Sequence, residues 1–223
     1  MKHADIEGKC VCHCSGALSS RVFDGISARG AAGLSVHPLA AIAGRWDSYR
    51  YMDSVPFTVE GDTAAAADMK AFLRSLGNPA ETIAADKKDA YHAGAVFLTN
   101  LVVALAHTGA ELLLSCGLNR EFVEDASRRL FFGNAENIYA HGAISALTGP
   151  VERGDTETVR KHLQSLKDPE RRLYALLSKE LLRIAKEKNP GRDYGEIEEE
   201  LNRCGTRRFP YRKRSRKTKR SPC

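Results

Sequence analysis

The sequence predicts an α/β region followed by an all-α region, and two observations lead to this prediction. Before residue 86, short apolar segments bounded by glycine, serine or proline alternate with helical stretches, which is typical of βαβ units and a parallel sheet. After residue 86, every apolar pattern repeats with the periodicity of a helix. The predicted regions are residues 1–85, residues 86–203 and a basic tail of residues 204–223, for which we expect disorder.

The bounds of the individual strands and helices are predicted from the glycine, serine, proline and capping residues between them. Strands are predicted where short apolar segments end at glycine, serine or proline, at residues 10–14, 33–36 and 57–60. Helices are predicted where a helical pattern lies between a capping residue and a helix breaker. The predicted helices are residues 19–26, 63–76, 86–116 and 119–139, one that begins at Asp155, and one that begins at Asp168 and Pro169 and stops at Asn189.

The positive charge is concentrated at the end of the chain. The formal net charge is +6, and residues 203–220 hold ten lysines and arginines without an aspartate or glutamate. The rest of the chain is therefore mildly acidic, which argues against a nucleic-acid-binding face on the folded part. Weak, salt-sensitive binding of RNA or DNA by the tail stays open as a hypothesis.

The longest apolar stretch, residues 93–106, is interrupted by Thr99 and Asn100. It is shorter than the roughly 20 apolar residues that a membrane-spanning helix requires, so we expect a buried helix of a soluble protein and no membrane contact. The first residues lack the apolar core of a secretory signal, which predicts a cytoplasmic location and reduced cysteines.

A cluster of cysteines near the start has the residue types of a zinc site but not the spacing. In an extended strand, Cys10, Cys12 and Cys14 would face one way and His13 the other. A structural zinc site would require a C-x-x-C turn and a second pair of ligands, and neither is evident. We therefore predict no metal, and we expect reduced cysteines buried in a core strand.

Two polar segments follow predicted strands and suggest a ligand crevice. Ligands of open α/β sheets bind at the carboxyl ends of the strands, where Ser15 and His37 would both project if the two strands are parallel. A histidine at this place can act as an acid or a base near neutral pH. The alternative is that His37 only ends a strand before a proline turn, and the spacing favours neither.

The long predicted helix and a later loop each carry polar residues that need an explanation. His92 and Asn100 lie along one broad stripe of the helix, where they either face a ligand or serve helix packing. In the loop of residues 147–155, a turn and a helix cap account for Gly149, Pro150 and Asp155 but not for Arg153. The guanidinium of Arg153 suits a carboxylate or a phosphate.

Taken together, these motifs resemble the oxidoreductases that pair a Rossmann-like NADP-binding domain with a C-terminal helical domain of unknown function. That family is similar to the 6-phosphogluconate dehydrogenase, pyrroline-5-carboxylate reductase and prephenate dehydrogenase group. The resemblance covers residues 10–188, and the motifs that carry it are residues 13–18, 35–39, 59–62, 91–100, 147–155 and 162–163.

The resemblance implies an activity and a set of site residues. It implies hydride transfer between NADP and a small carbonyl, hydroxy or imino substrate, with His37, Ser15 and His92 as the catalytic residues. It also implies that Asn100, Arg153 and Thr148 bind the substrate, and that Ser15 and Gly16 contact the cofactor. The helical domain of the family usually forms a homodimer, which we expect here too.

One departure from the family concerns the dinucleotide. The family begins with a strand, a glycine-rich turn and a helix that hold the pyrophosphate, and no G-x-G-x-x-G occurs in this sequence. We therefore expect a C-terminal portion of such an enzyme, inactive without the missing nucleotide-binding segment. The alternative is a non-catalytic, dimerising protein that binds a ligand.

Overall fold

The computed structural model describes residues 5–42, 44 and 46–205. Most of the predicted basic tail, residues 206–223, lies outside the described residues. The chain divides into two compact units, Met1–His107 and Thr108–Cys223.

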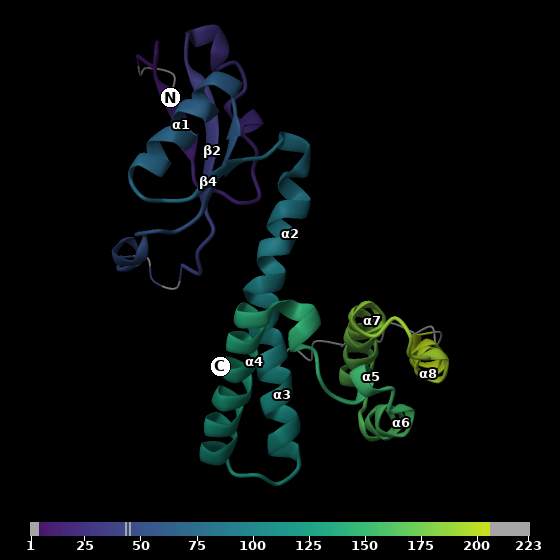
Figure 1. Ribbon diagram of the computed structural model, residues 1–223. Helices are drawn as coiled ribbons and strands as arrows, with labels where there is room; N and C mark the ends of the chain where they lie inside the picture. The colour runs from purple at the N-terminus through teal and green to yellow at the C-terminus, as the bar shows by residue number, and fades with distance from the viewer. Residues whose placement is uncertain (1–4, 43, 45, 206–223) are drawn as a thin grey trace, which may run out of the picture. The chain divides into compact units, whose positions relative to one another are not determined.

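The first unit contains a four-stranded sheet in the order β1-β2-β3-β4 (Figure 1). The three predicted strands are confirmed, and a fourth, short strand joins them; the bounds are β1 Cys10–His13, β2 Ala32–Pro38, β3 Phe57–Gly61 and β4 Ala80–Thr82. β1 runs parallel to β2, and β3 runs parallel to β4.

The sheet is mixed because β2 and β3 pair antiparallel. A parallel pair requires a long crossover, usually a helix, between its strands. The described part of the β2–β3 connection holds only the short 3-10 helix η3, Ser48–Tyr51. The chain therefore turns back beside β2 instead of crossing over, which the sequence pattern did not reveal.

One face of the sheet is covered by helix α1, Thr63–Ser75, in good agreement with the predicted helix 63–76. The carboxylate of Asp62 caps this helix by accepting from the amides of Ala64 and Ala65 at 3.1 and 3.0 Å. The apolar core beneath α1 is built from β2, β3, β4 and α1, by Leu34, Val36, Val59, Ala66, Leu73 and Ala80.

The opposite face of β2 and β3 is polar. Side chains alternate along a strand, so the neighbours of Leu34, Val36 and Val59 must point away from α1. The register pairs Ser35 with Glu60 and His37 with Thr58 directly across the two strands. Four polar side chains thus form one layer on the face that α1 does not cover.

The predicted helix 86–116 is interrupted. After the 3-10 helix η4, Ala85–Lys87, the chain forms α2, Lys88–Leu98, and α3, Asn100–Ser115. Between α2 and α3, Thr99 leaves the helical conformation, with φ −125° and ψ −86°. Its hydroxyl donates to the carbonyl of Ala95 at 2.8 Å, which competes with regular helical bonding at this point.

The prediction that this apolar stretch is buried is wrong for the described chain. No residue of α3 is buried, and Leu101, Val103 and Leu105 are exposed. By length and composition, residues Ala85–Ser115 also meet the requirements of a membrane span, a test that core helices of soluble proteins pass as well. Part of this apolar helix is therefore exposed within the described residues.

The second unit is helical, as predicted. Its helices are α4 Arg120–Ala146, α5 Pro150–Arg153, α6 Thr156–Ser165, α7 Glu170–Lys188 and α8 Gly195–Gly205. Asp155 caps α6 as predicted, and α7 begins one residue after Pro169. The core of the unit joins α5, α6, α7 and α8, around Val151, Val159, Leu163, Leu182, Ile197 and Leu201. Helix α8 was not predicted, because the basic residues that follow it suggested a tail.

Candidate functional site

Lys88 at the start of α2 is the charged centre of the polar layer. Its side chain reaches the uncovered face of the sheet, and only 2% of the residue is exposed. The ammonium group donates to the carbonyl of Ser15 at 3.2 Å and to Oγ of Ser35 at 2.7 Å. These bonds compensate part of the desolvation of a buried charge. Burial still lowers the pKa of Lys88, while the charge of Glu60 opposes this effect.

Glu60 connects the polar layer to the segment that follows β1. The residue is 4% exposed, and its carboxylate accepts from the amide and the hydroxyl of Ser20 at 2.7 and 2.8 Å. Ser20 is the first residue of the 3-10 helix η1, Ser20–Phe23. Glu60 therefore holds this turn against the sheet and supplies a negative charge that partly balances Lys88.

His37 lies next to the two hydroxyl groups of Tyr91 and Thr58. Its Nδ1 is 2.6 Å from the hydroxyl of Tyr91, which accepts a hydrogen bond from Oγ1 of Thr58 at 2.7 Å. Burial, and then the charges of Lys88 and His92, lower the pKa of His37. Burial raises the pKa of Tyr91, although the bond from Thr58 acts in the other direction. Both groups are therefore held in their neutral forms at neutral pH.

The other nitrogen of His37 faces Gly16 and His92. A Cβ atom on Gly16 would lie 2.7 Å from Nε2 of His37 and 2.7 Å from Nδ1 of His92. The two imidazole rings are 6.2 Å apart and nearly perpendicular, at 80°. Nδ1 of His92 is buried and has no hydrogen-bond partner among the described residues. The two rings therefore pack directly against Gly16, where any side chain would displace them.

A cleft of about 580 Å³ adjoins the two histidines. His37, His92 and Asn100 all line it, together with apolar residues from segments 38–42 and 95–103. The structure thereby brings three of the predicted site residues to one place within the first unit. A mostly apolar cleft with a few convergent polar groups is typical of a site for a small organic ligand.

Ser15 takes part in a different way from the one predicted. Its hydroxyl accepts from the amide of Leu18 at 3.1 Å, and so serves the turn after β1. Its backbone carbonyl, rather than its hydroxyl, faces the site, where it accepts from Lys88 and from Ser35. The adjacent Gly16 contributes through the absence of a side chain.

The remaining predicted residues lie in the second unit. Arg153 is the last residue of α5, Thr148 precedes that helix, and both are exposed. Their roles in substrate binding stay predictions.

The prediction of buried cysteines in a core strand is wrong. Cys10, Cys12 and Cys14 are exposed, because β1 is an edge strand and α1 packs mainly on β3 and β4. Within the described residues, no three His, Cys, Asp or Glu side chains are arranged to hold a metal ion.

Comparison with known proteins identifies the family. The sequence model of a family described as "Domain of unknown function (DUF2520)" matches residues 55–181, more than half of the chain. The chain belongs to the DUF2520 family. The match spans β3 to most of α7, and so includes Thr58, Lys88, Tyr91 and His92 of the polar site.

Solved structures show the same fold as this DUF2520 chain. Protein TM1727 from Thermotoga maritima has 28% identity and a TM-score of 0.70, over 81% of this chain and 70% of that one. Protein BF3122 from Bacteroides fragilis, described as a candidate NADP oxidoreductase, has 26% identity and a TM-score of 0.60, over 80% and 68%. A search of the curated proteins finds no match. The predicted fold, that of the Rossmann-like NADP oxidoreductases with a helical second part, is confirmed.

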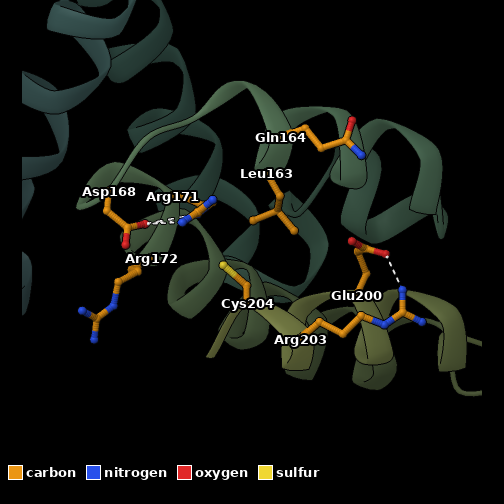
Figure 2. Close-up of a pocket in the computed structure, with 8 residues that line it drawn as sticks. All are labelled: Leu163, Gln164, Asp168, Arg171, Arg172, Glu200, Arg203 and Cys204. Carbon is orange, nitrogen blue, oxygen red and sulfur yellow. Dashed lines mark hydrogen bonds and ion pairs between the residues drawn. The ribbon is translucent and has the colours of Figure 1, made fainter. Parts of the chain in front are cut away.

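The second unit of the DUF2520 chain has a cavity of its own. It has a volume of about 270 Å³ and is lined by three arginines among other residues of α6, α7 and α8. Arg171 is paired with Asp168 at 3.0 Å, and Arg203 with Glu200 at 3.2 Å (Figure 2). Because neighbouring carboxylates engage these guanidinium groups, the cavity has less positive character than its residue types suggest.

The sequence analysis assigned no role in the site to Lys88, Tyr91, Thr58 and Glu60, although Tyr91 and Glu60 lie within motifs of the family resemblance. One signal was available, because the alternation in segments 33–38 and 57–61 places a polar residue at every second position of strands that are otherwise apolar. Lys88 also precedes His92 by four positions, which puts the two on one side of a helix. Neither pattern predicts that these polar side chains are buried, because their burial depends on which elements cover that face of the sheet.

Proposed function

We propose that this chain acts on the oxygen or nitrogen of a small carbonyl or imino compound during NADP-dependent hydride transfer. The observation that carries this proposal is the buried Nδ1 of His92, which has no partner among the described residues and lies near Nε2 of His37 at a cleft that both histidines line. Ring nitrogens at such a place can bind the atom on which negative charge develops in such a reaction. The cleft beside them has the size and the apolar lining for the rest of a small molecule.

In this proposal His37 is the acid or base on the reacting atom, and His92 orients that atom. The lowered pKa keeps the imidazole of His37 neutral, so that it can donate or accept a hydrogen bond without a competing charge. The ammonium of Lys88, held on the carbonyl of Ser15, places a positive charge close to the site. That charge favours a reacting atom that becomes more negative. Asn100 lines the same cleft and contributes an amide for substrate binding.

The segment after β1 bears on how a dinucleotide could bind. When bound, NADPH would supply the hydride, and the backbone of Ser15 and Gly16, next to His37 and His92, would contact its nicotinamide end. The diphosphate does not fit the described residues in the same way. After β1 the chain forms the four-residue 3-10 helix η1, and not a glycine-rich turn with an α-helix behind it. We propose that hydride transfer needs a phosphate-binding segment in addition to the described residues.

The second unit supplies two further parts of the proposal. Arg153, on α5, would hold an acidic group of the substrate, and Thr148 would contribute a hydroxyl. The chain would work as a cytoplasmic homodimer, because exposed apolar side chains of α3, such as Leu101 and Val103, need a cover that a second copy can provide.

A second function, ligand binding without catalysis, is favoured because the described residues after β1 do not form a glycine-rich turn that could bind the diphosphate. If no dinucleotide binds, the same cleft and the same exposed helix describe a non-catalytic dimer that binds a small ligand. The two functions differ in whether hydride leaves a nicotinamide.

The test is deuteride transfer by the full chain, alone and preceded by an added glycine-rich βαβ segment that binds a diphosphate. Each protein is incubated with NADPH deuterated at the nicotinamide and with a panel of small ketones, keto acids and cyclic imines, and the products are analysed by mass spectrometry. NADPH binding is measured in parallel by fluorescence. The proposal predicts a deuterated product from the protein with the added segment and none from the chain alone, and it predicts that His37→Ala in the extended protein lowers turnover while NADPH affinity changes little.

The outcomes separate the two functions. Binding of NADPH without transfer to any member of the panel would contradict the oxidoreductase proposal. Absence of NADPH binding, together with a dimer in light scattering, would favour the ligand-binding dimer.

A further inference from the structure

We propose that Thr58 and Tyr91 form a hydrogen-bond relay that fixes the tautomer of His37, so that the imidazole hydrogen resides on Nε2 beside Gly16. Tyr91 and Thr58 are thereby positioning residues, which act on the substrate only through His37. The catalytic meaning of this inference rests on the proposed function, whereas the tautomer itself is a property of the chain that can be measured without a substrate.

The relay begins with the geometry of the sheet. His37 and Thr58 are paired directly across β2 and β3, on the face opposite α1. Tyr91 belongs to α2, and its hydroxyl lies 2.6 Å from Nδ1 of His37 and 2.7 Å from Oγ1 of Thr58. The tyrosine ring stands edge-on to the imidazole at 90°, with the ring centres 5.7 Å apart. Three elements thus hold one short chain of polar atoms.

Counting hydrogens gives the direction of this chain. Thr58 is 7% exposed, and Tyr91 is the only hydrogen-bond partner of its hydroxyl among the described residues. If Thr58 donates to Tyr91 and Tyr91 donates to His37, each hydroxyl hydrogen has an acceptor. In the reverse direction the hydrogen of Thr58 would have none, which is costly in a buried place. The forward direction is therefore favoured.

The direction decides what His37 presents to the cleft. A neutral imidazole that accepts at Nδ1 carries its hydrogen on Nε2. Nε2 is the atom that lies beside Gly16 and near Nδ1 of His92, at the cleft that both histidines line. His37 would therefore meet a ligand as a hydrogen-bond donor, which narrows its proposed role of acid or base to that of a donor to a carbonyl oxygen that gains negative charge.

The charged groups around His37 agree with a neutral donor. Lys88, Tyr91 and His92 on α2 lie around it, and Glu60 lies two positions beyond Thr58 on β3. Burial, Lys88 and His92 lower the pKa of His37. A neutral imidazole whose donor is fixed by a neighbour can polarise a carbonyl without becoming an imidazolium.

The test is nitrogen NMR of the full chain labelled with 15N-histidine, without cofactor or substrate. The shifts of Nδ1 and Nε2 show which nitrogen carries the hydrogen. We expect His37 to carry it on Nε2 in the wild type. In Tyr91→Phe, which keeps the ring but loses the hydroxyl, we expect a mixture with more Nδ1–H and a higher midpoint for the titration of His37, because the bond that favours the neutral form is gone.

A matched pair of variants tests the first member of the relay. Thr58→Val removes the hydroxyl at nearly constant shape, and we expect a smaller change in the same direction as in Tyr91→Phe. Thr58→Ser keeps a hydroxyl, and we expect it to restore the wild-type shifts. Circular dichroism confirms that each variant is folded.

Two results would overturn the inference. One is a wild-type His37 that carries its hydrogen on Nδ1. The other is a Tyr91→Phe variant whose His37 stays entirely in the Nε2–H form, because the tyrosine would then not determine the tautomer. Failure of the proposed function looks different: the relay would be found by NMR as expected, while no deuteride would be transferred.

Discussion

The two faces of β2 and β3 are built from alternate residues of the same strands, yet they follow different rules. On the α1 face, Leu34 and Val59 are both 0% exposed and belong to the apolar core cluster. On the other face, Ser35 is equally buried, but it holds the ammonium of Lys88. Burial of the apolar face stabilises the fold without any requirement on geometry. On the polar face, each buried polar atom requires a hydrogen-bond partner.

Under the proposed function, this difference marks the place where stability is lower in exchange for chemistry. A buried lysine and a buried glutamate on one sheet face stabilise a fold less than apolar side chains of the same volume would. The polar face also contains the one buried side-chain nitrogen without a partner among the described residues, Nδ1 of His92. Such an atom is expected at a place that a ligand completes.

The largest expected effect concerns the apolar face. Leu34→Ala should lower the free energy of unfolding by about 3 kcal/mol, because it removes buried methyl groups and leaves a cavity under α1. Leu76→Ala, at an exposed leucine, should change it by less than about 0.5 kcal/mol. Urea denaturation followed by the NMR signals of β2 and β3 measures both. Equal effects for the two variants would contradict the assignment of the core.

The next effect concerns the polar face. In Gly16→Ala the new Cβ must displace the rings of His37 and His92, which should shift their NMR signals and lower turnover roughly tenfold. Gly109→Ala is the matched control, since a Cβ there would meet no atom within 4 Å. Unchanged histidine signals in Gly16→Ala would mean that the two nitrogens do not converge at this glycine.

The smallest effect is a pH dependence of stability. The pKa of His37 lies below its ordinary value of 6.5 in the folded chain, so the unfolded chain takes up this proton first as the pH falls. The free energy of unfolding should therefore decrease as the pH drops below 6.5, towards the lowered pKa. His37→Gln should remove this part of the dependence, and His107→Gln, at an exposed histidine, should keep it. Urea denaturation at a series of pH values compares the three proteins, and parallel curves for all of them would contradict the prediction.

Local sequence was sufficient for some parts of the fold and not for others. Alternation and capping predict β2, β3, α1 and the cap of α6, because these depend on neighbours in the chain. The antiparallel direction of β3 and the edge position of β1 depend on how the strands are ordered, and so the buried cysteines were predicted wrongly. The interruption at Thr99 lies within a continuous helical pattern, which gave no sign of it.

Some residues of the site could likewise be predicted from local sequence, and others could not. His37 and His92 could be predicted as polar residues at strand and helix positions that face a crevice. Lys88 could not, because its partners are distant in sequence: Ser35 lies 53 residues away and Ser15 lies 73 residues away. An ionised side chain is expected on the surface until its buried partners are known.

The central claim is that the polar face is the chemical site while the apolar face only holds it. The most direct test is the turnover of His37→Gln per folded molecule in the chain that carries an added nucleotide-binding segment, measured by deuteride transfer from NADPH at saturating substrate. The account predicts a fall of about 100-fold, as for the loss of an acid or base. It also predicts an unchanged affinity for NADPH and a free energy of unfolding within about 1 kcal/mol of the wild type. Wild-type turnover in a folded His37→Gln variant would contradict the account.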